Sequence, residues 1–336
     1  MATSIPVRSK EFDYSKPVDG SNPATDWQGL HTLEESITIT NPDNGWIQNC
    51  NSTPFTAAAQ YSPVASDYPS YMAPDNENFR GIQAVRILED AEGLTIEKLI
   101  DLAYDPHLTA FEVLIPGIVK AYTKYPSNDS KIKAAIDTLK MWDFTVSINS
   151  VAMSLAQYYG QIYLRNGNPP GNLSYIDRVR YYGSESPLSE RIKIFEQAID
   201  QLEQDFGQWN TPWGEINRYQ RLNGDIRQPF NDEKASTAIP MASSRWGALA
   251  SFGARTYPGT NRMYGTSGNS FVAVVEFGDR VRAKSLLAGG QSGDPNSPHF
   301  DDQVNLYQAG TFKNVNYYRG DVEAKAEETY QPGIRE

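Results

Sequence analysis

The spacing of apolar and polar residues divides the chain into three parts. Residues 1–80 are polar and irregular, and within them the alternating stretch ESITITNP predicts one short strand that ends at Pro42. Residues 81–207 carry apolar side chains at helical spacing, whereas residues 208–336 return to Gly, Ser and strand patterns. This order of short strands, a helical block and then further strands predicts a single α+β domain over residues 1–336 rather than alternating βαβ units.

Several helix boundaries in the central block can be predicted from single residues. Thr95 is the expected N-cap of a helix that stops before the next proline, and Pro116 is expected to kink the helix that follows. The clearest helix lies in SPLSERIKIFEQAIDQLEQDFG, where Ser186 or Ser189 is the expected N-cap and Gly207 the expected end.

Strand signals dominate the last third of the chain. The stretch SFVAVVEF is almost continuously apolar, which predicts a buried strand. The stretch SRWGALASFGARTY precedes it with a turn between them, so we expect antiparallel pairing. The sequence contains no internal repeat and no flexible linker.

The composition indicates a globular protein and argues against two classes of partner. Hydrophobic residues make up 39% and charged residues 21% of the 336 residues, and the net charge is -11. A strongly acidic chain is a poor ligand for nucleic acid or an anionic membrane, so neither is expected as a partner. No apolar run approaches the roughly 18 residues that span a membrane, and the first residues, MATSIPVRSKEFDYSK, lack the apolar core of a signal peptide.

The residue types that hold metals and nucleotides are sparse. Cys50 is the single cysteine, so no internal disulfide and no cysteine-based metal cluster can form. The three histidines, His31, His107 and His299, are far apart in sequence, so they do not predict a histidine-based metal site. The chain has no dinucleotide-binding glycine motif and no P-loop.

One loop combines turn residues with side chains that favour burial. The stretch NPDNGWIQNCNSTPF, residues 41–55, contains Trp46, Ile47 and Phe55 among several amides. A buried amide costs free energy unless its donors and acceptors are paired. In an extended segment Asn49 and Asn51 would share one face, where an amide could donate to the oxyanion of an acyl-transfer reaction. Alternatively, both amides cap the backbone of the loop.

A second group of candidate residues lies in GGQSGDPNSPHFDD. Ser292, His299, Asp301 and Asp302 are the residue types of a Ser-His-Asp relay, but they do not form the G-x-S-x-G elbow and lie within one loop. The alternative is a tight turn at residues 289–290, with the Ser and His side chains holding the loop backbone.

Taken together, an ordered set of motifs resembles the penicillin acylase (penicillin amidase) family of N-terminal-nucleophile hydrolases. The resemblance is greatest to its acyl-homoserine-lactone acylase and aculeacin acylase branch. The matching stretches run in family order across essentially the whole chain and include KPVDGSNPATDWQGLHTLEE, NPDNGWIQNCNSTPF, NFRGIQAVRIL, PWGEINRYQRL, YGTSGNSFVAVVEFGDRVRAKSLLAGGQSGDPNSPHFDDQ and YQPG. The resemblance implies part of the four-layer αββα fold and the hydrolysis of an amide between an acyl group and an amine.

The resemblance also implies roles for individual residues. Asn51 matches the family's oxyanion-hole asparagine, and Arg80 matches an arginine at the start of the next helix that supports the site electrostatically. Trp46, Asn49 and Phe55 are the implied substrate contacts.

No cofactor is implied to be required, but a structural calcium ion is expected in some members. Asp67, within VASDY, resembles the aspartate that binds calcium in those members.

The chain departs from the family pattern at the nucleophile. In the family, a serine at a new N-terminus attacks the amide, and it lies far upstream of the oxyanion loop. Here Asn51 is too close to Met1, and Ser4 does not match the family's cleavage context. We therefore expect this chain to resemble the C-terminal part of the β-chain and to be inactive without an α-chain and the first part of the β-chain.

Two further interpretations stay open. The chain is either a separately encoded subunit that docks with a missing half and exposes a large apolar surface, or a non-catalytic binding relic with a closed surface. The implied substrates are small N-acyl amides such as N-acyl-homoserine lactones or acylated lipopeptides, and the implied location is periplasmic or secreted.

Overall fold

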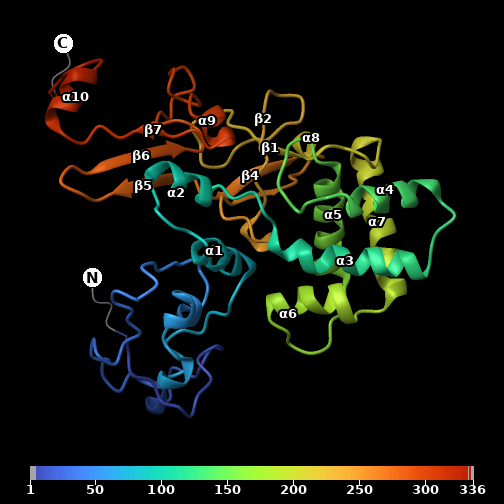
Figure 1. The fold of residues 1–336 in the computed structure, drawn as a ribbon, viewed down its shortest axis with the longest axis horizontal. Helices are drawn as coiled ribbons and strands as arrows, with labels where there is room; N and C mark the ends of the chain where they lie inside the picture. The colour runs from blue at the N-terminus through green and yellow to red at the C-terminus, as the bar shows by residue number, and fades with distance from the viewer. Residues whose placement is uncertain (1–4, 332, 334–336) are drawn as a thin grey trace.

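The computed structural model describes residues 5–331 and 333, and its mixture of helices and sheets confirms the α+β prediction. Figure 1 shows three regions: an irregular N-terminal segment beneath helix α1, a helical block to one side, and strands across the top. Helix α1 lies where the three regions meet (Figure 1). The candidate residues Asn51 and Arg80 are therefore close to the junction of all three.

The N-terminal segment is built from turns rather than strands. It contains one isolated bridge, between Pro6 and Leu30. Its short 3-10 helices are η1 Pro23–Thr25, η2 Pro54–Thr56, η3 Ala59–Tyr61 and η4 Ala65–Asp67. The strand predicted in ESITITNP is wrong: residues 37–41 form no strand, and none of them donates a backbone hydrogen bond to a described residue. The alternating pattern is present, but a strand requires a neighbour that pairs its backbone groups.

The helical block follows the predicted boundaries closely. Its helices are α1 Phe79–Glu89, α2 Ile96–Ala103, α3 Thr109–Lys124, α4 Ser130–Lys140, α5 Val151–Asn166, α6 Tyr175–Arg180, α7 Leu188–Phe206 and α8 Trp213–Ile216, with a π turn, η5 Tyr181–Glu185, after α6. Thr95 caps α2 by accepting from the Lys98 N–H, and Gly207 ends α7 with a left-handed φ of 76°. Helix α3 runs through Pro116 to Lys124.

The start of α7 differs from the prediction. Pro187 occupies the N-cap position and makes no side-chain cap. Ser186 is buried and accepts a 3.1 Å hydrogen bond from Nε of Arg191, while its own hydroxyl lies 2.8 Å from that of Tyr163. The serine is therefore used in packing between helices instead of in capping.

The main core lies between α3, α5 and α7. Eleven residues of α5 are buried, so this helix is covered on most of its surface, as its apolar sequence predicts. Trp246 stacks on Phe111 with ring centroids 4.7 Å apart, and its ring packs against Gly160 of α5, where a Cβ atom would lie 2.5 Å away. The strand region thereby shares one core with the helices.

Two small sheets complete the fold. The first contains β1 Asn217–Tyr219, β2 Thr237–Ala238, β3 Phe252–Arg255 and β4 Met263–Gly268 in the order β2-β1-β4-β3, with β1 and β4 parallel. The second contains β5 Phe271–Glu276, β6 Arg282–Leu287 and β7 Lys313–Asn314, all antiparallel. The remaining helices are α9 Val304–Ala309 and α10 Arg319–Lys325.

The stretch SFVAVVEF does form a strand, β5, but it is not buried as predicted. Only Val274 is fully buried, while Phe271 and Val275, which lie on the other face, are exposed. β5 is an edge strand, so a purely apolar sequence here does not mean that both faces are covered.

Candidate active site

The loop of residues 41–55 is less buried than its sequence suggests. Asn49 and Asn51 are both exposed, and the fully buried amide of the loop is Gln48. Asn51 has a φ of 55°, in the left-handed region, so the loop turns at this residue and the predicted extended segment is wrong. Asn tolerates this conformation better than most residues do.

Hydrogen bonds to its backbone and to its side chain fix the conformation of Asn51. Its backbone N–H donates to Oδ1 of Asn49 at 2.9 Å, so the Asn49 side chain does cap loop backbone. Its side-chain Oδ1 accepts from a guanidinium nitrogen of Arg80 at 2.5 Å. Within the described residues the Nδ2 group of Asn51 donates to no acceptor. The amide is therefore held by its oxygen while its two N–H groups stay available.

Asn78 joins this loop to helix α1. Its Oδ1 caps α1 by accepting from the Gly81 N–H at 2.9 Å, and its Nδ2 donates to the carbonyl oxygens of Cys50 and Asn51, each at 3.1 Å. Sequence reasoning missed Asn78. The N-cap signal was available, because Asn78 immediately precedes the apolar periodic stretch that begins with Phe79.

The close approach of α1 to the loop depends on a glycine. A Cβ atom at Gly81 would lie 2.3 Å from Oε1 of Glu77 and 2.8 Å from Oγ of Ser52. Glu77 accepts a hydrogen bond from its neighbour Asn78 and another from Thr56. This carboxylate therefore ties the far end of the loop to the start of α1.

Cys50 lies beside Arg80 but has the character of a neutral thiol. Burial raises the pKa of Cys50, and the nearby Arg80 guanidinium only partly opposes that shift. A raised thiol pKa disfavours the thiolate, which is the nucleophilic form. Cys50 is accordingly a poor nucleophile for this site.

The loop and the start of α1 form the wall of a groove. One cavity of about 440 Å³ is lined by Cys50, Asn51 and Arg80 on one side and by Ser243–Arg245 and Ser267–Asn269 on the other. A second cavity of about 380 Å³ has Asn49, Asn51 and Arg80 at one end and apolar side chains of α1 and α2 at the other. Asn51 and Arg80 lie at the meeting point of both cavities.

The other predicted substrate contacts are placed differently. Asn49 lines the 380 Å³ cavity, whereas Trp46 and Phe55 line neither cavity. Phe55 instead packs on Tyr68, with ring centroids 6.2 Å apart. Trp46 is half-buried within the loop.

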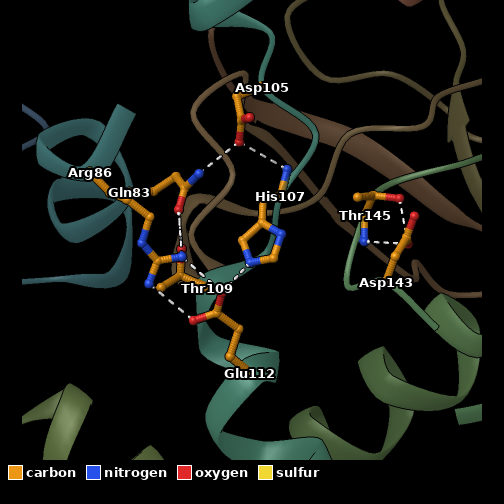
Figure 2. A network of polar contacts seen from close by, with 8 residues as sticks. All are labelled: Gln83, Arg86, Asp105, His107, Thr109, Glu112, Asp143 and Thr145. Carbon is orange, nitrogen blue, oxygen red and sulfur yellow. Dashed lines mark hydrogen bonds and ion pairs between the residues drawn. The ribbon is translucent and has the colours of Figure 1, made fainter. Parts of the chain in front are cut away.

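A polar network holds α1 against α3 (Figure 2). Arg86 of α1 donates to both carboxylate oxygens of Glu112 on α3, at 2.8 and 3.1 Å, and His107 Nε2 lies 2.5 Å from the same carboxylate. Gln83 of α1 donates to Asp105 at 2.9 Å and accepts from Thr109 at 3.0 Å. Because α1 presents Arg80, this network fixes the helix that supplies half of the candidate site.

The predicted calcium ligand stands alone. Asp67 is exposed at the end of η4, and within residues 5–331 and 333 no three His, Cys, Asp or Glu side chains gather into a group that could hold a metal ion. Calcium takes six to eight oxygen ligands, which include backbone and amide carbonyl oxygens as well as carboxylates, so the grouping of acidic side chains alone does not decide this position. A calcium site at Asp67 stays a prediction.

Ser292 and His299 hold the backbone of their loop, as the alternative interpretation of a tight turn predicts. Oγ of Ser292 accepts from the Asp294 N–H at 3.1 Å, and the Ser292 N–H donates to the His299 carbonyl at 3.0 Å. His299 Nδ1 lies 3.0 Å from Asp302, and this contact raises the pKa of His299. The three side chains do not form a relay, because no hydrogen bond joins Ser292 to the His299 ring in the described chain.

Ser4, the formal candidate for the nucleophile, lies outside the described residues.

Across the described residues, none of the helices combines the length and the apolar character that crossing a bilayer would require.

Comparison with known proteins identifies the family. A family model described as penicillin amidase matches residues 1–324. Among solved structures, the fold is similar to that of a thermostable penicillin G acylase from Alcaligenes faecalis, with a TM-score of 0.56 and 18% sequence identity. The similarity covers 99% of this chain and 64% of that chain, so the protein spans less than two thirds of the acylase's length. The family match extends over nearly the whole sequence, and the chain therefore belongs to the penicillin amidase family.

Proposed function

We propose that this chain supplies the oxyanion-stabilising part of an amide hydrolase that deacylates small N-acyl amides. In the proposed reaction, Nδ2 of Asn51 donates to the oxygen of the tetrahedral intermediate, and Arg80 supports the site electrostatically. Family membership supports the reaction class. N-acyl-homoserine lactones are the proposed substrates, the proposed fold is part of an αββα architecture, and the proposed location is the periplasm or the outside of the cell.

The arrangement of the Asn51 amide carries this proposal. Its oxygen accepts from the Arg80 guanidinium, and its Nδ2 is without an acceptor in the described part of the chain. A cation bound to the oxygen polarises the amide and strengthens its N–H donors. An oxyanion hole needs donors that are oriented before the charge develops, and an amide fixed in this way meets that requirement.

We also propose that the nucleophile comes from a partner polypeptide. Phe271 on β5 is 63% exposed and Phe277, just beyond it, is 84% exposed. Such side chains on one face of an edge strand favour the interpretation as a docking subunit over that of a relic with a closed surface. The proposed partner contains the α-chain and the N-terminal part of the β-chain.

The test measures amine release from a long-chain N-acyl-homoserine lactone by the purified chain, alone and together with the polypeptide encoded immediately upstream of it. We expect turnover only in the combination. Within the combination, Asn51→Asp keeps the acceptor for Arg80 but loses the Nδ2 donor, so it should lower kcat by about 10²- to 10³-fold.

Asn128→Asp is the matched control, because it makes the same change at an exposed asparagine that lines neither cavity, and it should leave kcat nearly unchanged. Equal rates for Asn51→Asp and the unaltered protein would refute the role of Asn51. Turnover by the chain alone would show that the nucleophile lies within these 336 residues.

A further inference from the structure

A further cavity lies beside the groove of Asn51 and has an unusual charge. It has a volume of about 610 Å³ and lies between α5, α6 and the strands β3 and β4. It shares Tyr175, Ser243, Arg245, Gly253 and Ser267 with the 440 Å³ cavity that contains Asn51. Its volume is typical of a site for a small organic ligand.

Four arginines line this cavity, and none of its lining residues is acidic. They are Arg165, Arg178, Arg245 and Arg255. Within the described residues none of the four forms an ion pair with a carboxylate; Arg178 donates to the Leu164 carbonyl at 3.1 Å, and Arg255 to the Tyr257 hydroxyl at 3.2 Å. In a chain with a net charge of -11, four arginines without a carboxylate partner form an exceptional concentration of positive charge.

Residues that line the cavity also carry buried hydrogen-bond donors that lack a protein partner. The buried atoms Nε2 of Gln157, Nε1 of Trp213, Nε of Arg178 and the hydroxyl of Tyr175 have no partner within the described residues. Oδ1 of Asn217 is the corresponding unpaired acceptor. Gln157 is only 2% exposed, so its unpaired amide nitrogen is costly unless a ligand or water completes it. Donors outnumber acceptors, which favours a ligand rich in acceptor oxygens.

The floor of the cavity is apolar. Trp213, Trp246, Phe252 and Met263 are all buried and line it. Tyr175 lines the cavity together with Arg178 and Arg245. Burial raises the pKa of the Tyr175 hydroxyl more than the two guanidinium groups lower it, so the hydroxyl is a neutral donor at physiological pH.

We infer that this cavity binds an amphipathic organic carboxylate, with its aromatic or aliphatic body on the tryptophan floor and its carboxylate among the arginines. The carboxylate satisfies the surplus donors and neutralises the arginine cluster, while the body fills the apolar end. The inference is independent of amide hydrolysis, because it concerns binding by the chain alone.

Isothermal titration of the purified chain tests this with three probes: 2-naphthoate, its neutral amide 2-naphthamide, and inorganic phosphate. The acid and the amide have the same shape, so they differ mainly in charge. We expect 2-naphthoate to bind about 10-fold more tightly than either other probe, which is the factor expected for one charge-assisted interaction. Equal affinity for acid and amide, or no binding of 2-naphthoate, would overturn the inference. Phosphate binding as tightly as 2-naphthoate would show a simple anion site and overturn it as well.

Substitutions then locate the bound carboxylate. Arg178→Gln and Arg245→Gln should each weaken 2-naphthoate binding by about 10-fold. Arg180→Gln is the matched control on the same helix, because Arg180 pairs with Asp177 and does not line the cavity. Arg178→Gln also removes the hydrogen bond to Leu164, so a thermal melt accompanies it. Arg245 is exposed and its side chain makes no hydrogen bond in the described chain, so Arg245→Gln should leave the stability of the fold unchanged. If Arg178→Gln destabilises the fold, the affinity of Arg245→Gln for 2-naphthoate decides the outcome. Unchanged affinity in Arg245→Gln would place the ligand elsewhere.

Discussion

At the scale of single residues, Asn51 combines two properties that few side chains share. Its backbone lies in the left-handed region at a φ of 55°. Its side-chain Oδ1 accepts a hydrogen bond from Arg80, while its Nδ2 group stays available as a donor. Alanine would lose the donor and would also be strained in this conformation. Aspartate keeps the shape and the acceptor, which is why it is the more informative substitution.

Glu112 predicts a pH dependence of stability. The Arg86 guanidinium, and then His107, hold the pKa of Glu112 below its usual value. The stabilisation from this pair is therefore complete above the unfolded-state pKa of about 4.3 and is lost as the pH falls through the lower folded-state pKa. Glu112→Gln should lower the free energy of unfolding by about 1 kcal/mol at pH 6, since the pair is partly exposed to solvent. Urea unfolding at pH 6 and pH 3 should show this difference shrinking with acidity.

Glu89→Gln is the control for that experiment, because Glu89 is exposed at the end of the same helix as Arg86. If the free energies of unfolding of Glu112→Gln and the unaltered protein differ as much at pH 3 as at pH 6, the ionised Glu112 carboxylate is not the source of the stabilisation.

At the scale of elements, the turn η5 and helix α3 approach each other through two glycines. A Cβ atom at Gly117 would lie 2.1 Å from the carbonyl oxygen of Gly183. Nη1 of Arg191, which is buried, donates to the carbonyl oxygens of both glycines, at 3.3 Å and 3.0 Å. The contact thus joins three segments, and it leaves no room for a side chain.

Gly117→Ala should consequently destabilise the fold by about 1–3 kcal/mol through overpacking. Chemical denaturation measures the loss. Gly20→Ala is the control, because a Cβ atom there would meet nothing within 4 Å and the residue has no positive φ. Equal stability of the two variants would mean that α3 and η5 separate without cost.

The elements that could be predicted from sequence are those whose determinants are local. Thr95 and Gly207 mark helix ends through their own side-chain and backbone chemistry, and the structure confirms both. The strand ending at Pro42 was wrong because strand formation depends on a partner that is distant in sequence. Likewise, the positive φ of Asn51 and its tie to Asn78, 27 residues away, depend on tertiary contacts that spacing alone does not show.

At the scale of the whole molecule, one face of the second sheet carries apolar side chains that are exposed in the described part of the chain. Phe271, Val275 and Phe277 are exposed at 63%, 42% and 84%, whereas Val274 on the opposite face is buried. An edge strand with an exposed apolar face tends to pair with another chain. The same feature supports the proposed partner and makes the isolated chain prone to self-association.

We therefore expect the purified chain to associate with itself as its concentration rises, and the double substitution of Phe271→Ser and Phe277→Ser to reduce this. Sedimentation velocity over a range of concentrations measures it. Tyr330→Ser removes a similarly exposed aromatic ring outside the sheet, 71% exposed, and should have no effect. A chain that stays monomeric at high concentration would favour the relic with a closed surface.

The double role of Asn78 has a consequence for local unfolding. One side chain caps α1 and also holds the carbonyls of Cys50 and Asn51. We therefore expect the first turn of α1 and the loop to open and close as one cooperative unit, so that the Gly81 amide hydrogen exchanges with solvent in proportion to the fraction of time that this unit is open. Hydrogen exchange at this single amide thus reports how much of the time the candidate site is assembled.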